Sequence, residues 1–426
     1  MPSSSRRVVL TGIGAITPIG IGAGAFWDAL QHGKSGVRTI TSFDPAALPA
    51  RFAGEVEGFD AKKFVSKEGR KQLKVMARAI QLAVGAAQLA MDDAKVDKAK
   101  LDCTRFGVEF GAGLLSTDLA ELGPASQESI GASPGTVDLR AWGTQGKAAI
   151  TPLWMLKYLP NMLACHVSIL HDAQGPNNTI TEGDAASLLA LGEAYQILRR
   201  GHADVFLAGG GDSKVNPLSM VRQAMFGHLS YGNENPADAC RPFDRRRDGL
   251  VIGEGACVVV VEDLEHAGRR GAAIYGEIVG FGSAFDRGVT GRGMARAMRA
   301  ALAQADVSPT EIDHVNAHGL GSPRFDAAEA KAIVDVFGPR GVPVWAIKGN
   351  IGNLGAAGSV TELAGSLLAM KRGSVPATRN FREPDEACSV AVTTAARDVA
   401  KPYFLKLGFT EMGQCAAVVI RSPLAS

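Results

Sequence analysis

Apolar and polar residues follow two different patterns along the chain, and the two patterns alternate. Short apolar runs, typical of buried strands, occupy residues 8–14, 105–113, 178–181, 203–211 and 256–261, and later residues 273–283, 312–316, 403–408 and 416–421. The segments between them predict helices at residues 77–91, 154–166, 185–198, 293–305, 327–337 and 358–371. Strands that alternate with helices in both halves of the chain predict an α/β fold with helices packed on the sheets.

One long segment carries neither pattern. Residues 114–146 are rich in glycine and polar residues and show no clear period. A loop of this length in a compact domain usually serves as a lid, a cap or a contact between subunits. The segment that precedes Arg241 is also expected to be looping.

The strand at residues 178–181 and the helix at 185–198 are joined by the sharp turn Glu182-Gly183-Asp184. A strand, a tight turn and a helix N-terminus form a nucleophile elbow, in which the residue at the tip is lifted out of the backbone. Free N–H groups and the helix dipole favour negative charge at such a tip. The turn places Asp184 there, where it either acts chemically or serves simply as a helix cap that contributes about 1 kcal/mol.

Composition narrows the class of protein. The 426 residues are 46% hydrophobic and 21% charged with a net charge of +2, which offers no strong field for nucleic acid or membrane binding. No apolar run approaches the ~18 residues of a membrane span, and the N-terminus lacks a signal-peptide core. The six scattered cysteines lack metal or disulfide spacing and indicate reduced thiols in a cytoplasmic protein. Gly12 and Gly14 begin a dinucleotide-binding fingerprint, but Thr17 stands where its third glycine is needed, so the sequence does not indicate dinucleotide binding.

Several motifs occur in a characteristic order. They are Thr11-Gly12-Ile13-Gly14, the frame of residues 175–192 around the turn, Arg241-Pro242-Phe243-Asp244, Asn316-Ala317-His318-Gly319 and Gly352-Asn353-Leu354-Gly355. With them, nearly the whole chain resembles the β-ketoacyl-acyl-carrier-protein synthases, the type II ketosynthases. The resemblance implies a thiolase-like fold of two similar halves, residues 1–262 and 263–426, stacked as a five-layered α-β-α-β-α sandwich. It also implies a dimer built across the first half.

The departures from the family concern its chemistry. The family's reaction uses a cysteine that takes the acyl chain as a thioester, and two histidines that support decarboxylation of malonyl-carrier protein. Asp184 stands at the cysteine position, His318 keeps the first histidine and Asn353 replaces the second. Lys348 and Glu329 are kept, and the resemblance gives them a part in charge support. An aspartate cannot make a stable thioester, and an asparagine cannot shuttle a proton as histidine does.

The expected channel to the tip has changed as well. By the resemblance, two threonines that hold the phosphopantetheine arm become Leu320 and Ser322. In the gating loop near the C-terminus, Phe409 is kept and Glu411 stands in place of the second phenylalanine. The resemblance implies no metal, and no cofactor beyond the phosphopantetheine arm of acyl-carrier protein.

A group of basic residues precedes the helix at residues 77–91. By the resemblance, Lys67, Arg70 and Lys71, called the basic patch below, align with the family's contacts to acyl-carrier protein. Such a patch either docks an acidic partner or is simply a solvated face.

Three functions remain open at this point. The first is a condensation-inactive protein of fatty acid or polyketide biosynthesis, similar to the chain-length factors, which are cysteine-less ketosynthase relatives that pair with an active subunit and shape its acyl tunnel. It would form a heterodimer with a cysteine-bearing ketosynthase, although a homodimer is also open. The second is a repurposed hydratase, dehydratase or hydrolase that uses Asp184 and His318 as acid and base on carrier-bound acyl chains. The third is residual condensation through an unorthodox site.

Overall fold

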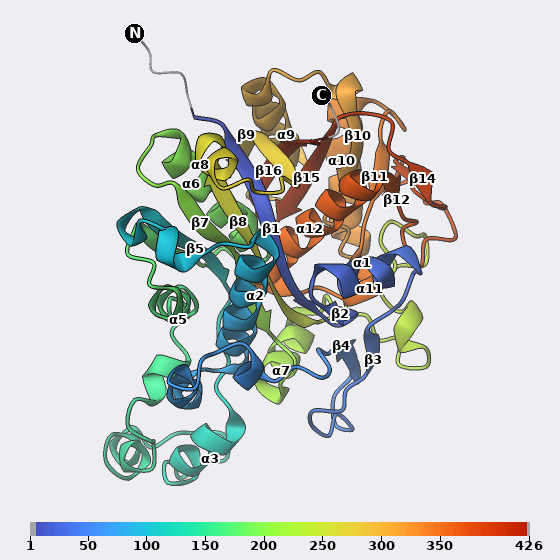
Figure 1. The fold of residues 1–426 in the computed structure, drawn as a ribbon. Coiled ribbons are helices and arrows are strands. Elements are labelled where there is room, and N and C mark those ends of the chain that lie inside the picture. Colours follow the sequence, from blue (N-terminus) through green and yellow to red (C-terminus); the bar gives the residue numbers. More distant parts are fainter. Residues whose placement is uncertain (1–5, 424–426) are drawn as a thin grey trace.

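Two mixed β-sheets form the framework of the protein in a computed structural model, which describes residues 6–423 (Figure 1). The first sheet holds β1 (Val8–Thr17), β5 (Phe106–Ala112), β6 (Asn177–Ile180), β7 (Val205–Ser213) and β8 (Glu254–Asp263). The second holds β9 (Gly276–Phe285), β10 (Ile312–Asn316), β11 (Pro343–Trp345), β15 (Tyr403–Phe409) and β16 (Gln414–Arg421), with β13 (Ala391–Val392) beside β11. A short antiparallel pairing between β1 and β9 joins the two sheets.

The two sheets have the same topology. Their orders are β6-β5-β7-β8-β1 and β11-β10-β15-β16-β9, so the third of these five strands in sequence stands at one end of each order and the first stands at the other. In both sheets the first three strands of this order are parallel and the last two pair antiparallel to their neighbours. This repetition of order and direction is the duplication that the family resemblance implied.

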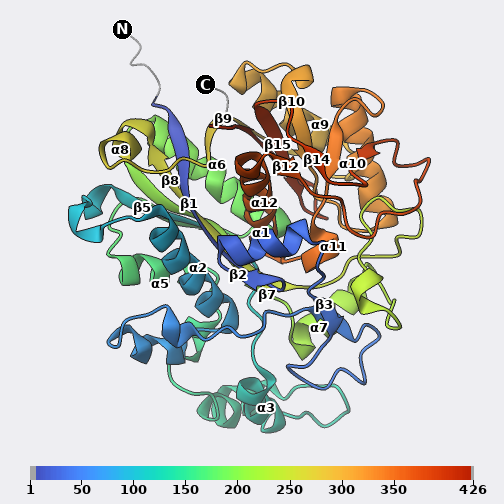
Figure 2. The same cartoon turned by 45° about the vertical axis from the view of Figure 1, so that its right-hand side comes forward.

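Helices cover both sheets and fill the space between them. The first outer layer is α2 (Arg78–Ala94) with α5 (Met162–His171), the middle layer is α6 (Ala186–Arg199) with α12 (Gly358–Arg372), and the second outer layer is α9 (Arg292–Ala305) with α10 (Pro323–Phe337). Figure 2 shows α12 between the two sheets. Three clusters of buried side chains fill the interlayer spaces. The predicted thiolase-like fold of five layers, α-β-α-β-α, is therefore confirmed.

Glycines on the first strand of each half allow an outer helix to approach closely. A Cβ atom at Gly14 in β1 would lie 1.9 Å from the carbonyl oxygen of Ala86 in α2. A Cβ atom at Gly280 in β9 would lie 2.1 Å from the carbonyl oxygen of Ala301 in α9. No side chain fits at such distances, so in both halves a glycine in the first strand allows the outer helix to pack closely against the sheet.

The segments without a clear pattern contain short elements. The long segment after β5 carries α3 (Leu119–Gln127) and α4 (Leu139–Ala141), which project from one end of the molecule (Figure 1). The segment before Arg241, expected to be looping, contains α7 (Pro217–Phe226), whose N-terminus is capped by the side chain of Asn216. The single helix expected at residues 154–166 is wrong in detail, because a 3₁₀ turn at Trp154–Lys157 precedes α5 and Pro160 lies between them.

The remaining elements are short and lie around this frame. They are β2 (Gly20–Ile21), α1 (Ala23–Gln31), β3 (Val37–Thr39), β4 (Phe52–Gly54), α8 (Leu264–Arg269), α11 (Lys348–Ile351), β12 (Ser374–Val375) and β14 (Arg397–Asp398). None of the helices within residues 6–423 is long and apolar enough to cross a membrane.

Candidate active site

The tip of the turn between β6 and α6 lies in the middle layer of the molecule. Gly183 adopts a φ of +49°, in the left-handed region that glycine tolerates, and a 3₁₀ turn (Gly183–Ala185) leads into α6. Asp184 is 9% exposed. Neither the turn nor α6 receives a side-chain capping hydrogen bond, so the interpretation of Asp184 as a helix cap has no support in the geometry.

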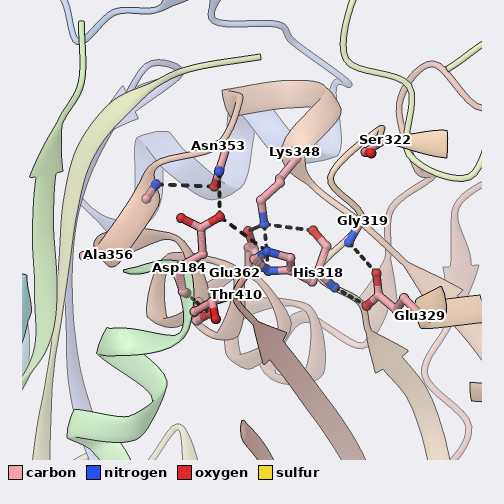
Figure 3. A network of polar contacts seen from close by, with 12 residues as sticks. Asp184, His318, Gly319, Ser322, Glu329, Lys348, Asn353, Ala356, Glu362 and Thr410 are labelled. Atoms are coloured by element: carbon pink, nitrogen blue, oxygen red, sulfur yellow. Dashed lines mark hydrogen bonds and ion pairs between the residues drawn. The ribbon is translucent and has the colours of Figure 1, made fainter. Parts of the chain in front are cut away.

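Three donors from separate parts of the chain lie near the Asp184 carboxylate, and two of them, Asn353 and His318, are visible in Figure 3. Asn353 donates its Nδ2–H to Oδ2 of Asp184 at 2.7 Å. His318 places Nε2 at 3.6 Å from the same oxygen, which is an electrostatic contact rather than a formed hydrogen bond. Lys214 places Nζ at 3.7 Å from Oδ1. The structure thus brings together the three positions at which the family has its cysteine and two histidines, and adds a lysine.

The charges of this group follow from its surroundings. Burial alone would raise the pKa of Asp184, but the ammonium of Lys214 and the imidazole of His318 outweigh it and hold that pKa well below its ordinary value. Burial, followed by the charge of Lys348, lowers the pKa of His318 to about 4, so its ring is neutral at neutral pH. Nζ of Lys348 lies 3.2 Å from Nδ1 of His318 and can only donate. We therefore assign the ring proton to Nε2, which faces Asp184.

Lys348 belongs to a buried charge cluster that the sequence did not reveal. Its ammonium pairs with Glu362, whose second oxygen pairs with Lys406, and it also donates to the carbonyl oxygen of His318 at 2.8 Å. All three charged side chains are fully buried. The available signal was Lys406, a charge inside the otherwise apolar strand β15.

Glu329 fixes the loop that carries His318 but does not touch its ring. Its carboxylate accepts from the backbone N–H groups of His318 at 2.6 Å and Gly319 at 2.8 Å. The carboxylate of Asp326 likewise accepts a hydrogen bond from the backbone N–H of Phe243 at 2.8 Å. Burial raises the pKa of Glu329 to about 7 and that of Asp326 to about 6. The contacts seen for Glu329 therefore hold the loop in position.

A second carboxylate shares Lys214 with Asp184. Oδ2 of Asp212 lies 3.7 Å from Nζ of Lys214 and accepts from the backbone N–H of Ala356 at 3.1 Å. Burial lowers the pKa of Lys214, but Asp212 and Asp184 outweigh this and raise it. Gly355 adopts a φ of +55°, and a Cβ atom there would lie 2.1 Å from Asp212, so the loop after Asn353 favours glycine at this position. Sequence reasoning missed this pair, although Asp212 lies near the end of the glycine-rich strand β7 and Lys214 directly follows that strand.

The residues expected to line the channel are all buried or partly buried. Leu320 and Ser322 are 1% and 4% exposed, and Phe409 is fully buried with its ring centroid 4.6 Å from that of His318. Glu411 is partly buried, and burial together with the charge of Asp184 raises its pKa. Figure 3 shows Thr410, from the same loop, beside Asp184. The expected gating segment therefore packs against the turn, where a Cβ atom at Gly183 would lie 3.5 Å from the Thr410 side chain.

The basic patch lies apart from this buried cluster. Lys67, Arg70 and Lys71 are exposed, on and just before a 3₁₀ helix (Gly69–Val75) that precedes α2. Arg70 donates to the carbonyl oxygen of Lys62 at 3.3 Å, and all three cations remain exposed to a partner.

Known proteins resemble this chain over almost its full length. The family model for the beta-ketoacyl synthase N-terminal domain matches residues 5–267, and the model for the C-terminal domain matches residues 275–382. The tetracenomycin polyketide synthase ketoacyl synthase alpha subunit of Streptomyces glaucescens is 36% identical over 99% of this chain and 98% of its own. The 3-oxoacyl-[acyl-carrier-protein] synthase 2 of Vibrio harveyi is 34% identical over 98% and 99%. The solved ishigamide ketosynthase/chain length factor has a TM-score of 0.87 and 30% identity, covering 98% of this chain and 100% of that chain.

Proposed function

The chain belongs to the β-ketoacyl synthase family, and from this membership we propose that it is a non-condensing subunit of fatty acid or polyketide biosynthesis that pairs with a cysteine-bearing ketosynthase. The observation that carries the proposal is the side chain at the tip of the turn and its hydrogen bonding. A buried, ionised Asp184 stands where the family's nucleophilic sulfur would be, and Asn353 donates to it.

The carboxylate interferes with condensation in two ways. It cannot hold an acyl chain as a stable thioester, so the covalent step is lost. It also takes the Asn353 amide and faces the Nε2 proton of His318, the donors that a reacting thioester oxygen would need. The loss of one such donor costs roughly 3–4 kcal/mol of transition-state stabilisation in enzymes that use them.

The repurposed acid–base enzyme has less support. A general base works best with a pKa near the operating pH. The pKa of Asp184 is far below that range, and the pKa of His318 is lowered to about 4 with its Nε2 proton directed at Asp184. Asp184 is also only 9% exposed. A hydratase, dehydratase or hydrolase would need this arrangement to open and change its protonation.

An exposed apolar surface supports the pairing. Large apolar side chains are exposed on α7 and on the segment after β5: Leu114, Leu119, Ile130, Val137, Leu139, Leu153, Met155, Val221, Met225 and Phe226. Contacts between Ser116 and Ser219 at 2.6 Å, and between Arg222 and Ser116 at 3.1 Å, connect α7 to that segment. An apolar surface of this extent is typical of a face that a partner covers. We propose that the ketosynthase covers it.

A cavity of about 730 Å³ opens between the start of this segment and the N-terminus of α7. Its lining is mixed: the apolar Met76, Leu115, Val215 and Pro217 lie beside charged side chains that include Arg78, Glu121 and Glu254. In the proposed complex this cavity supplies part of the space for the partner's growing acyl chain, as a chain-length factor would. The basic patch is proposed to dock acyl-carrier protein.

Intact mass spectrometry tests the proposal. The purified chain is incubated with acyl-carrier and malonyl-carrier protein, alone and with a cysteine-bearing ketosynthase with which it is co-expressed. We expect no acylation of this chain, acylation of the ketosynthase, and co-purification of the two as a heterodimer. Acylation or condensed product with this chain alone, lost on Asp184→Ala, overturns the proposal. Dehydrated or hydrolysed acyl chains with this chain alone favour the acid–base enzyme.

A further inference from the structure

The strand β6 forms one edge of the first sheet. It pairs with β5 on one side and, within residues 6–423, with no strand on the other. Its first residues, Asn177 and Asn178, are exposed. A free strand edge is a ready site for pairing with another chain unless it is covered or charged. This edge carries no charge of its own, so it is open to a partner strand.

A buried acid lies one strand inside this edge. Glu109 in β5 is in register with Asn178 in β6 and is 1% exposed. Its Oε2 atom is buried and has no hydrogen-bond partner among the described residues. Buried carboxyl oxygens are normally paired, so this one points to a missing contact.

The elements packed around Glu109 offer it no cation. Alternate residues of β5 face α6, since a Cβ atom at Gly111 would meet the backbone of Ser187. The charged group that α6 presents is another acid, Glu193. The neighbours in register are Asn178 on β6 and the small apolar Ala208 on β7. Burial and the charge of Glu193 raise the pKa of Glu109 to about 8.

A second copy of this chain would not supply the missing cation. Two copies that pair through β6 with two-fold symmetry bring the same surface to each other. The groove beside this edge is lined on β6 and α6 by Ile180, Leu189, Gly192, Glu193 and Gln196, and its one charged side chain is acidic. A second copy therefore brings its own acidic groove next to the Glu109 and Glu193 carboxyl groups of the first. A different chain has no such restriction.

We propose that Glu109, Glu193 and the β6 edge form an acidic seat for a lysine or arginine of a different subunit, and that this seat disfavours pairing of two copies. The inference rests on the proposed function, since it specifies the partner of the same subunit. The occupant is a polypeptide that places a basic side chain at the β6 edge.

The pH dependence of association distinguishes the two kinds of dimer. In a homodimer Glu109 gains a second acidic neighbourhood and no cation, so ionisation opposes association and affinity falls as pH rises past about 8. In the heterodimer a cation favours the ionised form, so affinity rises as pH increases from about 6 to about 8. Each ionising carboxyl changes the association constant by up to tenfold per pH unit.

Sedimentation measures the self-association of the full chain at about pH 6, 7 and 9. We expect the wild type to lose at least about tenfold in affinity between pH 7 and pH 9. The isosteric Glu109→Gln variant should lose this dependence and self-associate more tightly at pH 9. Asn178→Lys, at an exposed position in register with Glu109, should do the same by supplying a cation. The control is Glu265→Gln, at an exposed acid on α8, which should match the wild type.

Equal self-association of the wild type and both variants at every pH, whether tight or absent, overturns the inference. So does a heterodimer with the co-expressed ketosynthase whose affinity falls between pH 6 and pH 8. Failure of the heterodimer to form at all, with the expected self-association results, instead removes the proposed function. The two failures are therefore distinguishable.

Discussion

Replacing Asp184 by asparagine tests whether this carboxylate holds the structure together or is a strained functional group. The change keeps the shape of the side chain and removes its charge. Asn353 then donates to a neutral oxygen in place of an ionised one at 2.7 Å. Lys214 loses one of its two carboxylates and keeps Asp212 at 3.7 Å.

The expected loss of stability comes from two contributions. A hydrogen bond to a charged group is worth about 1 kcal/mol more than a neutral one. The attraction between Lys214 and Asp184 at 3.7 Å is about 4 kcal/mol gross at an effective dielectric constant near 20. Much of that is offset, because the variant no longer buries a charge and relieves repulsion between Asp184 and Asp212. We expect Asp184→Asn to lower the free energy of unfolding by about 2 kcal/mol.

The pH dependence of this loss has a definite sign. The pKa of Asp184 in the folded protein is below its ordinary value near 3.9 in an unfolded chain. The ionised carboxylate therefore contributes stability above about pH 4, and the contribution disappears as pH falls through the folded pKa. The difference between wild type and variant should be constant from about pH 5 to pH 8 and shrink below about pH 4.

Urea unfolding, followed by circular dichroism across this pH range, measures the difference. A matched control is Asp335→Asn on α10, because Asp335 is 56% exposed in its side chain and pairs with Arg299 at 3.0 Å. That exposed pair should contribute less than about 1 kcal/mol. An Asp184→Asn variant that is as stable as the wild type, or more stable, refutes the reasoning. Asp184 would then be held at an energetic cost, as catalytic groups are, and the acid–base enzyme would gain support.

Three further predictions concern the same site and the basic patch. Asp184→Cys alone should condense at least about 100-fold more slowly than Asp184→Cys with Asn353→His, because the amide cannot transfer a proton; product formation from acyl- and malonyl-carrier protein measures this. Lys348→Met should destabilise the fold by about 3 kcal/mol, because Glu362 loses one of two buried partners, and should raise the pKa of the His318 imidazole, followed by NMR, from its present value of about 4. Neutralising the basic patch with glutamine should weaken binding of acyl-carrier protein by about tenfold at low salt and leave little salt dependence, whereas Lys100→Gln on another exposed surface should not.

The apolar pattern predicted the layers well because most strands are continuously buried. The runs at residues 312–316 and 416–421 correspond closely to β10 and β16. It missed α7, whose signal was the cap Asn216 before Pro217 rather than an apolar stripe. The pattern also carries no information on which segments meet across the fold. Glu362 and Lys406 are 44 residues apart, and their contact depends on the packing of α12 against β15.

The turn residues Gly183 and Asp184 predicted the tip itself, since a left-handed glycine followed by a helix is a local signal. The positions of His318, Lys348 and Asn353 came from the family resemblance, and the structure places all three at the tip or in contact with its neighbours. Lys214 escaped prediction because a lysine after a strand has many possible roles in a sequence. Its meaning depends on the buried carboxylates on either side of it.

The contacts of Asp184 close into a ring, and this argues that the site was rebuilt around the carboxylate. Asn353 donates to Asp184, and its own oxygen accepts from the backbone of Gly355 at 3.3 Å. The next N–H, of Ala356, is bound by Asp212, and Lys214 joins Asp212 back to Asp184. A nucleophile that was merely lost would leave a buried charge at the tip without a counter-charge, at a cost of several kcal/mol. Here a partly buried lysine, Lys214, compensates it, and the neighbouring loop depends on glycine to fit. A single change to cysteine would leave Lys214, Asp212 and Asn353 arranged for an anion that is no longer there, so under the proposed function we expect condensation to require change at several of these positions.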